Sequence, residues 1–113
     1  MKITQTKRGD VLVLSLDGNL VGEPDTSELR TIIYDLLEQG TRTIVLDLGS
    51  LRVINSMGLG VLIASLTSMR KRGGDMSLAK LNDKVEGVFV ITKLFKVIRI
   101  YDTVERALKG SRS

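Results

Sequence analysis

The sequence predicts a single α/β domain, with a mixed, mostly parallel sheet of four to five strands flanked by about four helices. Short aliphatic runs alternate along the chain with longer segments whose apolar residues recur at helical spacing. This alternation is typical of parallel strands joined by crossover helices. The 113 residues match the commonest domain size, and 42% of them are hydrophobic. We assign residues 1–109 to the domain and 110–113 to a disordered C-terminal tail.

Two strands are expected at the start of the chain. Residues 2–7 suit an edge strand, and residues 11–16 suit a second strand that ends at Asp17-Gly18. Leucines occupy alternate positions in the second strand and valines occupy the positions between them. We therefore expect both faces of this strand to be covered.

The first helix is predicted by an apolar stripe at positions i, i+3, i+4, i+7 and i+8. Asp25 and Glu28 stand before it at the spacing of a capping box, and Gly40 supplies a left-handed stop. The residues that form the stripe are Leu29, Ile32, Ile33, Leu36 and Leu37.

The second half of the chain continues the same alternation. Strands are expected at 43–48, 76–81 and 96–101, and a buried second helix at about 57–72. A third helix is expected from Asp83 and a short fourth helix after Asp102. The acidic pairs Asp83/Glu86 and Asp102/Glu105 repeat the capping-box spacing, so capping accounts for them better than paired catalytic carboxylates do.

Composition excludes several kinds of site. The chain has no cysteine and no histidine, which excludes disulfides, cysteine or histidine metal sites and serine–histidine triads. It has no Gly-Lys-Ser/Thr triplet, and Ile63 stands where a dinucleotide fingerprint needs a third small residue. We expect no enzymatic activity, no cofactor and no metal.

The net charge and hydropathy of the chain limit the kinds of partner that we expect. The net charge is +4, and the cluster Arg70-Lys71-Arg72 is typical of a helix C-terminus. No basic stripe with aromatic residues is present, so nucleic acid is not an expected partner. The N-terminus lacks the apolar core of a signal peptide, and no apolar run approaches the ~20 residues of a membrane span. We therefore expect a cytoplasmic protein with no membrane partner.

Residues 54–60 are the candidate site. They place Ser56 on a tight turn between a buried strand and a buried helix, where its hydroxyl could cap the helix or carry a phosphate near the positive end of the helix dipole. Both interpretations stay open from the residues alone. Asp47 also has two interpretations. In one it caps the Ser56 turn or lies at the open end of the sheet, and in the other it is a site residue close to Ser56.

The stretch from Ile44 to Leu62 resembles the signature of STAS domains, and more narrowly of bacterial anti-sigma-factor antagonists. The resemblance extends over essentially the whole chain. It implies that the unphosphorylated protein binds an anti-sigma factor that is also a serine kinase. It further implies that the kinase inactivates the protein by phosphorylating Ser56, and that a serine phosphatase reverses this.

The chain departs from the family pattern beside the serine. The family usually has Asp before the serine and a small residue after it, whereas this chain has Asn55 and Met57. Asn55 keeps the capping ability without the negative charge, Met57 is bulkier, and Arg52 is a local cation for a phosphate. The expected binding surface comprises the Ser56 turn, the start of the second helix and the nearby loop from Gly18 to Pro24. The residues expected to contact the partner are Asn19, Glu23, Asp25, Asp47, Asn55, Met57 and Gly58.

Two other functions fit the same fold. One is a STAS scaffold or adaptor, without phosphorylation, in a signalling or lipid-transport assembly. The other is small-molecule or nucleotide binding at the carboxyl ends of the strands. A homodimer and a monomer both remain open.

Overall fold

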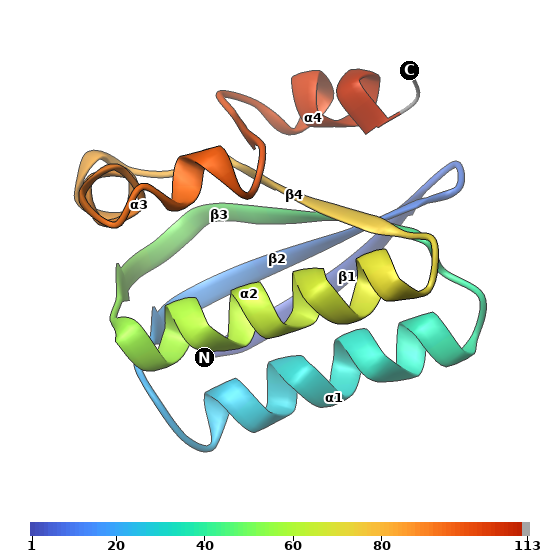
Figure 1. Cartoon of the computed structure of the whole chain (residues 1–113), viewed down its shortest axis with the longest axis horizontal. Coiled ribbons are helices and arrows are strands. Elements are labelled where there is room, and N and C mark those ends of the chain that lie inside the picture. Colours follow the sequence, from blue (N-terminus) through green and yellow to red (C-terminus); the bar gives the residue numbers. More distant parts are fainter. Residues whose placement is uncertain (112–113) are drawn as a thin grey trace.

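Five strands form one sheet in the order β1-β2-β3-β4-β5 within residues 1–111, the part of the chain that the computed structural model describes. β1 is antiparallel to β2, and the other neighbours are parallel (Figure 1). The predicted α/β class with a mixed, mostly parallel sheet is confirmed. The strands are β1 (Lys2–Arg8), β2 (Val11–Leu20), β3 (Thr43–Ile54), β4 (Asp75–Ala79) and β5 (Ile100–Tyr101).

Helices cover both faces of the sheet. α1 and α2 lie together on one face and α4 lies on the other (Figure 1). The larger apolar core joins the sheet to α1, α2 and α3, and the smaller joins it to α4. The helices of the described range are α1 (Asp25–Glu38), α2 (Ser56–Lys71), α3 (Asp83–Ile91), the 3-10 helix η1 (Leu94–Lys96) and α4 (Val104–Ser111).

β2 and β3 are longer than predicted. β2 continues through Gly18 to Leu20, and β3 continues through Gly49 to Ile54, because the two strands keep pairing past two irregularities in their register. Glycine and charged residues suggested strand ends here, but pairing between distant segments overrides that local signal. The extension carries β3 directly to Ser56.

β5 is shorter than predicted. The expected strand 96–101 is reduced to Ile100–Tyr101. Lys93 has a left-handed backbone, with φ of 61°, and η1 follows it. The N–H of Ile98 donates to the carbonyl of Leu94 at 3.1 Å, so the segment turns before it reaches the sheet.

The three predicted capping boxes are wrong, and the N-cap position of each helix lies one residue from the predicted cap. The Asn82 side chain accepts from the N–H of Val85 and begins α3, and the Thr103 hydroxyl accepts from the N–H of Arg106 before α4. α1 begins after Pro24 with no capping side chain. Five of the six acidic residues still lie in first turns, where they complement the helix dipole: Asp25, Glu28, Asp83, Glu86 and Glu105.

The last helix reaches into the predicted tail. α4 includes Gly110 and Ser111, and the Ser111 hydroxyl donates to the carbonyl of Ala107 at 2.8 Å. Residues 112–113, the rest of that tail, lie outside the described residues. Within residues 1–111, no helix has the length and hydropathy that crossing a membrane requires.

Candidate functional site

Asn55, and not Ser56, caps α2. The Asn55 side-chain oxygen accepts from the N–H of Gly58 at 3.1 Å, and its amide nitrogen donates to the Val21 carbonyl at 2.8 Å. Ser56 is the first residue of the helix, so its interpretation as the cap is wrong. Its side chain is exposed, and its hydroxyl has no hydrogen-bond partner anywhere in residues 1–111. The hydroxyl is therefore accessible for modification.

Gly58 holds the turn against the end of β2. A Cβ at this position would lie 2.2 Å from the carbonyl oxygen of Leu20 and 2.7 Å from a side-chain carbon of Ile54. The backbone N–H of Asn55 also donates to the Leu20 carbonyl, at 3.4 Å. This close approach fixes the start of α2 relative to two strands.

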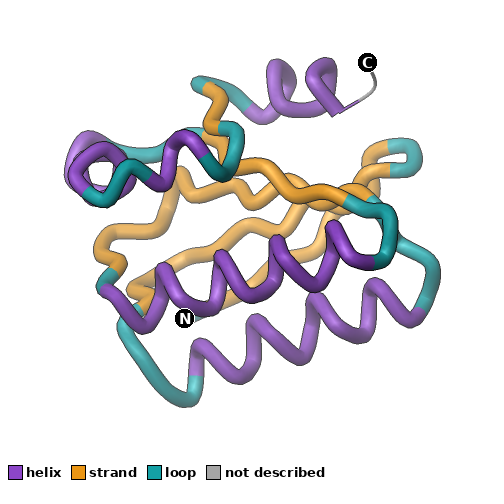
Figure 2. The backbone as a smooth tube through the Cα atoms, in the orientation of Figure 1, coloured by secondary structure: helices purple, strands orange, loops and turns teal. Residues whose placement is uncertain are grey.

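Two exposed apolar residues belong to the turn with Ser56 and to the loop that touches it. Met57 is 54% exposed and Val21, in the loop before α1, is 42% exposed. The sulfur of Met57 lies 3.6 Å from where a Cβ on Gly22 would be, so the loop and the turn touch. Figure 2 shows the loop after β2 leaving the sheet beside the junction of β3 with α2. We call Val21, Gly22, Asn55, Ser56 and Met57 the Ser56 surface.

The loop from Gly18 to Pro24 was expected in the binding surface, but Val21 was not singled out within it. Val21 stands between a buried leucine and a glycine, and nothing local distinguishes it from a core residue. Its position beside Asn55 depends on the pairing of β2 with β3, which joins residues more than 30 positions apart.

The start of α2 differs electrostatically from the other three α-helices of the described chain. Its first turn contains no acidic side chain, whereas those of α1, α3 and α4 do. The N–H groups of Ser56 and Met57 have no acceptor within the helix. Uncompensated N–H groups at a helix start favour an anion there. Arg52, the expected local cation, lies 3.6 Å from Asp17, and both side chains are mostly exposed.

Asn19, Glu23 and Asp25 lie at the same end of the sheet. Asn19 is exposed and pairs in register with Val53. Glu23 accepts from the hydroxyls of Ser27 and Thr26 and from the Ser27 N–H, and these hydrogen bonds lower the pKa of its carboxyl group, Ser27 contributing most. Asp25 lies 3.3 Å from the α-amino group of Met1.

Asp47 does not join this group, so its placement close to Ser56 is wrong. Its carboxylate accepts from the N–H of Gly49 at 3.0 Å and from the Ser15 hydroxyl at 3.4 Å. It shares the α4 face of the sheet with Val45, and the remaining residues of β3 separate it from Ser56. That length of strand is on the order of 20 Å.

The STAS domain family matches residues 2–107. The chain belongs to the STAS domain family. No group of three or more acidic, cysteine or histidine side chains within residues 1–111 is arranged to hold a metal ion.

Relatives and solved structures match over nearly full length. A candidate anti-sigma factor antagonist of Thermotoga maritima is 32% identical over 91% of both chains. The anti-sigma F factor antagonist of Paenibacillus polymyxa is 29% identical over 96% of this STAS domain and 92% of its own length. The crystal structure of a candidate antagonist from Thermotoga maritima superposes with a TM-score of 0.91 at 29% identity, covering 98% of this chain and 95% of that one.

The fold also occurs in more distant proteins. The phosphorylated form of a Bacillus cell-fate determinant has a TM-score of 0.74 at 20% identity, covering 96% of this chain and 98% of its own. At that identity the likeness supports the fold alone.

Proposed function

We propose that this STAS domain is an anti-sigma factor antagonist whose binding to an anti-sigma factor with serine kinase activity is abolished by phosphorylation of Ser56. One observation carries the proposal. The Ser56 hydroxyl is exposed at the first position of α2 and has no partner among residues 1–111, because Asn55 supplies the cap. A kinase can reach this hydroxyl without opening the helix.

The surroundings of Ser56 support a binding surface. Met57, next to Ser56 in sequence, and Val21, whose carbonyl accepts from Asn55, offer exposed apolar area that a partner can bury. A phosphate adds about −1.5 to −2 charges. Placed between apolar contacts, that charge would lose water when the partner docks, which opposes binding. We place Asn19, Glu23 and Asp25 at the rim of the interface.

The folded domain is suited to carry the phosphate. The first turn of α2 contains no acidic side chain that would repel it, and free N–H groups point toward it. Modification is therefore expected to change affinity while leaving the fold intact. The names of the relatives support the role, and a protein of the same fold has been solved in a phosphorylated form.

The first experiment maps phosphate on the protein recovered from its own cells, in growth and under stress, by intact-mass and peptide mass spectrometry. We expect a single phosphate on Ser56 that is lost in Ser56→Ala and removed by a serine phosphatase. Ser68→Ala is the matched control, since Ser68 is an exposed serine on the same helix. A protein that stays unmodified in every condition would contradict the switch.

The second experiment measures binding to the anti-sigma factor kinase by calorimetry. Ser56→Ala should bind as the unmodified protein does, and Ser56→Glu or phosphorylated protein at least about tenfold more weakly, a loss of ~1.4 kcal/mol or more. Circular dichroism should show the same fold in all of them. Equal affinity of the phosphorylated and unmodified proteins would overturn the mechanism.

A further inference from the structure

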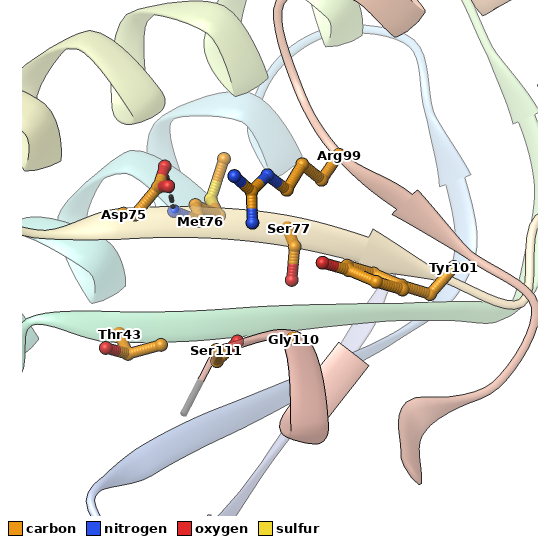
Figure 3. A pocket seen from close by; sticks show the side chains of 8 residues that line it. All are labelled: Thr43, Asp75, Met76, Ser77, Arg99, Tyr101, Gly110 and Ser111. Carbon is orange, nitrogen blue, oxygen red and sulfur yellow. Dashed lines mark hydrogen bonds between the residues drawn. The ribbon is translucent and has the colours of Figure 1, made fainter. Parts of the chain in front are cut away.

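A pocket lies at the opposite end of β3 from Ser56, where β3 and β4 begin and α4 ends. Its volume is about 240 Å³. Figure 3 shows the side chains around it, which come from β3, β4, β5, the residue before β5 and the end of α4. The lining residues are Thr43, Asp75, Met76, Ser77, Arg99, Tyr101, Gly110 and Ser111.

Ser77 brings an unpaired buried hydroxyl to this pocket. Its side chain is only 7% exposed, and its oxygen has no hydrogen-bond partner in residues 1–111. It lies on β4 between Met76 and Leu78, which face the larger core on the other side of the sheet. A buried hydroxyl without a partner costs stability, as it also does for Ser65 on α2, but Ser77 additionally lines a pocket, so its hydroxyl is a candidate donor to a molecule bound there.

Arg99 brings an unpaired positive charge. Its side chain makes no hydrogen bond or ion pair with any residue in the described range. The nearby carboxylate of Asp75 is occupied: it lies 3.2 Å from the side-chain nitrogen of Arg70 and accepts from the N–H of Met76 at 2.9 Å. The guanidinium of Arg99 is therefore available to a ligand.

Tyr101 completes a set of donors. In Figure 3 its hydroxyl points toward Ser77. Together, Arg99, Ser77 and Tyr101 present a planar N–H fork and two hydroxyl groups to one pocket. A fork of N–H donors with hydroxyls beside it matches the oxygens of a phosphate group.

We propose that this pocket binds a small oxyanion of the phosphate type, either free or as a simple monoester. Arg99 binds the anion through its N–H groups, and the hydroxyls of Ser77 and Tyr101 donate to the remaining oxygens. Because the pocket and Ser56 lie at opposite ends of β3, this site is independent of phosphorylation at Ser56.

The test is a titration of the isotope-labelled protein with inorganic phosphate, followed by NMR of the backbone amides. We expect saturable shifts centred on Ser77, Arg99 and Tyr101, and at least tenfold weaker binding in Arg99→Gln. Arg30→Gln is the matched control: it removes the same charge from exposed Arg30 on α1, on the opposite face of the sheet. Shifts that do not saturate, or an equal response in both variants, would overturn the proposal.

A parallel titration with glycerol 3-phosphate distinguishes the two sources of the anion. Tighter binding of the ester assigns the site to monoesters, and tighter binding of inorganic phosphate assigns it to the free anion. Absence of binding by both probes overturns the proposal.

Ser77→Ala gives an independent readout through the melting temperature. Without phosphate, the variant should melt at a higher temperature than the native protein, because the unpaired hydroxyl is gone. Added phosphate should raise the melting temperature of the native protein more than that of the variant. Equal gains in the two proteins would rule out Ser77 as a ligand.

Discussion

Asn55 and Ser56 divide two tasks between adjacent residues. Asn55 uses both ends of its amide, one to cap α2 and the other to hold the loop at Val21. Ser56 is thereby left without a structural role, although serine is itself a favoured cap. The chemistry of the hydroxyl can change without loss of the helix start.

Asn55→Ala should destabilise the protein by about 1–2 kcal/mol, since it removes a cap and a bond to the neighbouring loop. Urea unfolding measures the change. Asn19→Ala is the control, because Asn19 is exposed and its side chain has no hydrogen bond within the described residues. This variant should change the free energy of unfolding by less than about 0.5 kcal/mol. A comparable loss in both variants would mean that the cap contributes nothing specific.

Cap residues were the least predictable feature at this scale. Acidic pairs before apolar runs located the helix starts, yet Asn82 and Thr103 perform the capping of α3 and α4. The cap depends on which residue leaves the helical conformation first. The apolar periodicity locates the start of a helix to within a residue or two, but it does not specify which residue caps the helix.

At the scale of the element, α2 contains two glycines with opposite surroundings. Gly58 has no space for a Cβ because the Leu20 carbonyl is in contact, whereas a Cβ on Gly60 would meet nothing within 4 Å. Both lie inside the helix, so each also lowers its stability through backbone freedom. Contact with β2 explains the first glycine, and nothing in the structure explains the second.

Gly58→Ala and Gly60→Ala should therefore change stability in opposite directions. Gly58→Ala should lower the free energy of unfolding by about 1–3 kcal/mol, because the new Cβ overpacks against the Leu20 backbone. Gly60→Ala should raise the free energy of unfolding by about 0.5–1 kcal/mol. Thermal or urea unfolding of the two single variants tests this. A gain at both positions would show that α2 can move away from β2.

The lengths of β2 and β3 show why element limits are hard to predict. Gly18 and Gly49 resemble strand ends, but each lies within a paired strand. The pairing partners come from the other strand, so no window of sequence around either glycine contains the information. The existence and order of the elements follow from local periodicity, and their limits follow from tertiary contacts.

For the whole molecule, the sheet separates two apolar cores of unequal size. The smaller core holds α4 to the sheet mainly through Ala107 and Leu108, packed on valines of β2 and β3. The turn with Ser56 could be predicted because strand, serine and helix are adjacent in sequence. The phosphate pocket could not, because Ser77, Arg99 and α4 meet only in the folded chain.

Leu108→Ala should destabilise the protein by about 2–5 kcal/mol, the range for removing a fully buried leucine. Lys109→Ala, at the next and exposed position, should change it by less than about 0.5 kcal/mol. Urea unfolding compares the two. If both variants match the native protein, α4 contributes little to the fold.

The contact between Gly58 and the Leu20 carbonyl has a consequence for recognition. Close packing of the turn against two strands leaves it little room to rearrange, so we expect the proposed binding surface to keep its shape when a partner docks. Association then orders little of this chain, and less of the binding energy is lost to conformational entropy. At such a surface, the phosphorylation proposed for Ser56 would act through added charge and not through a change of shape.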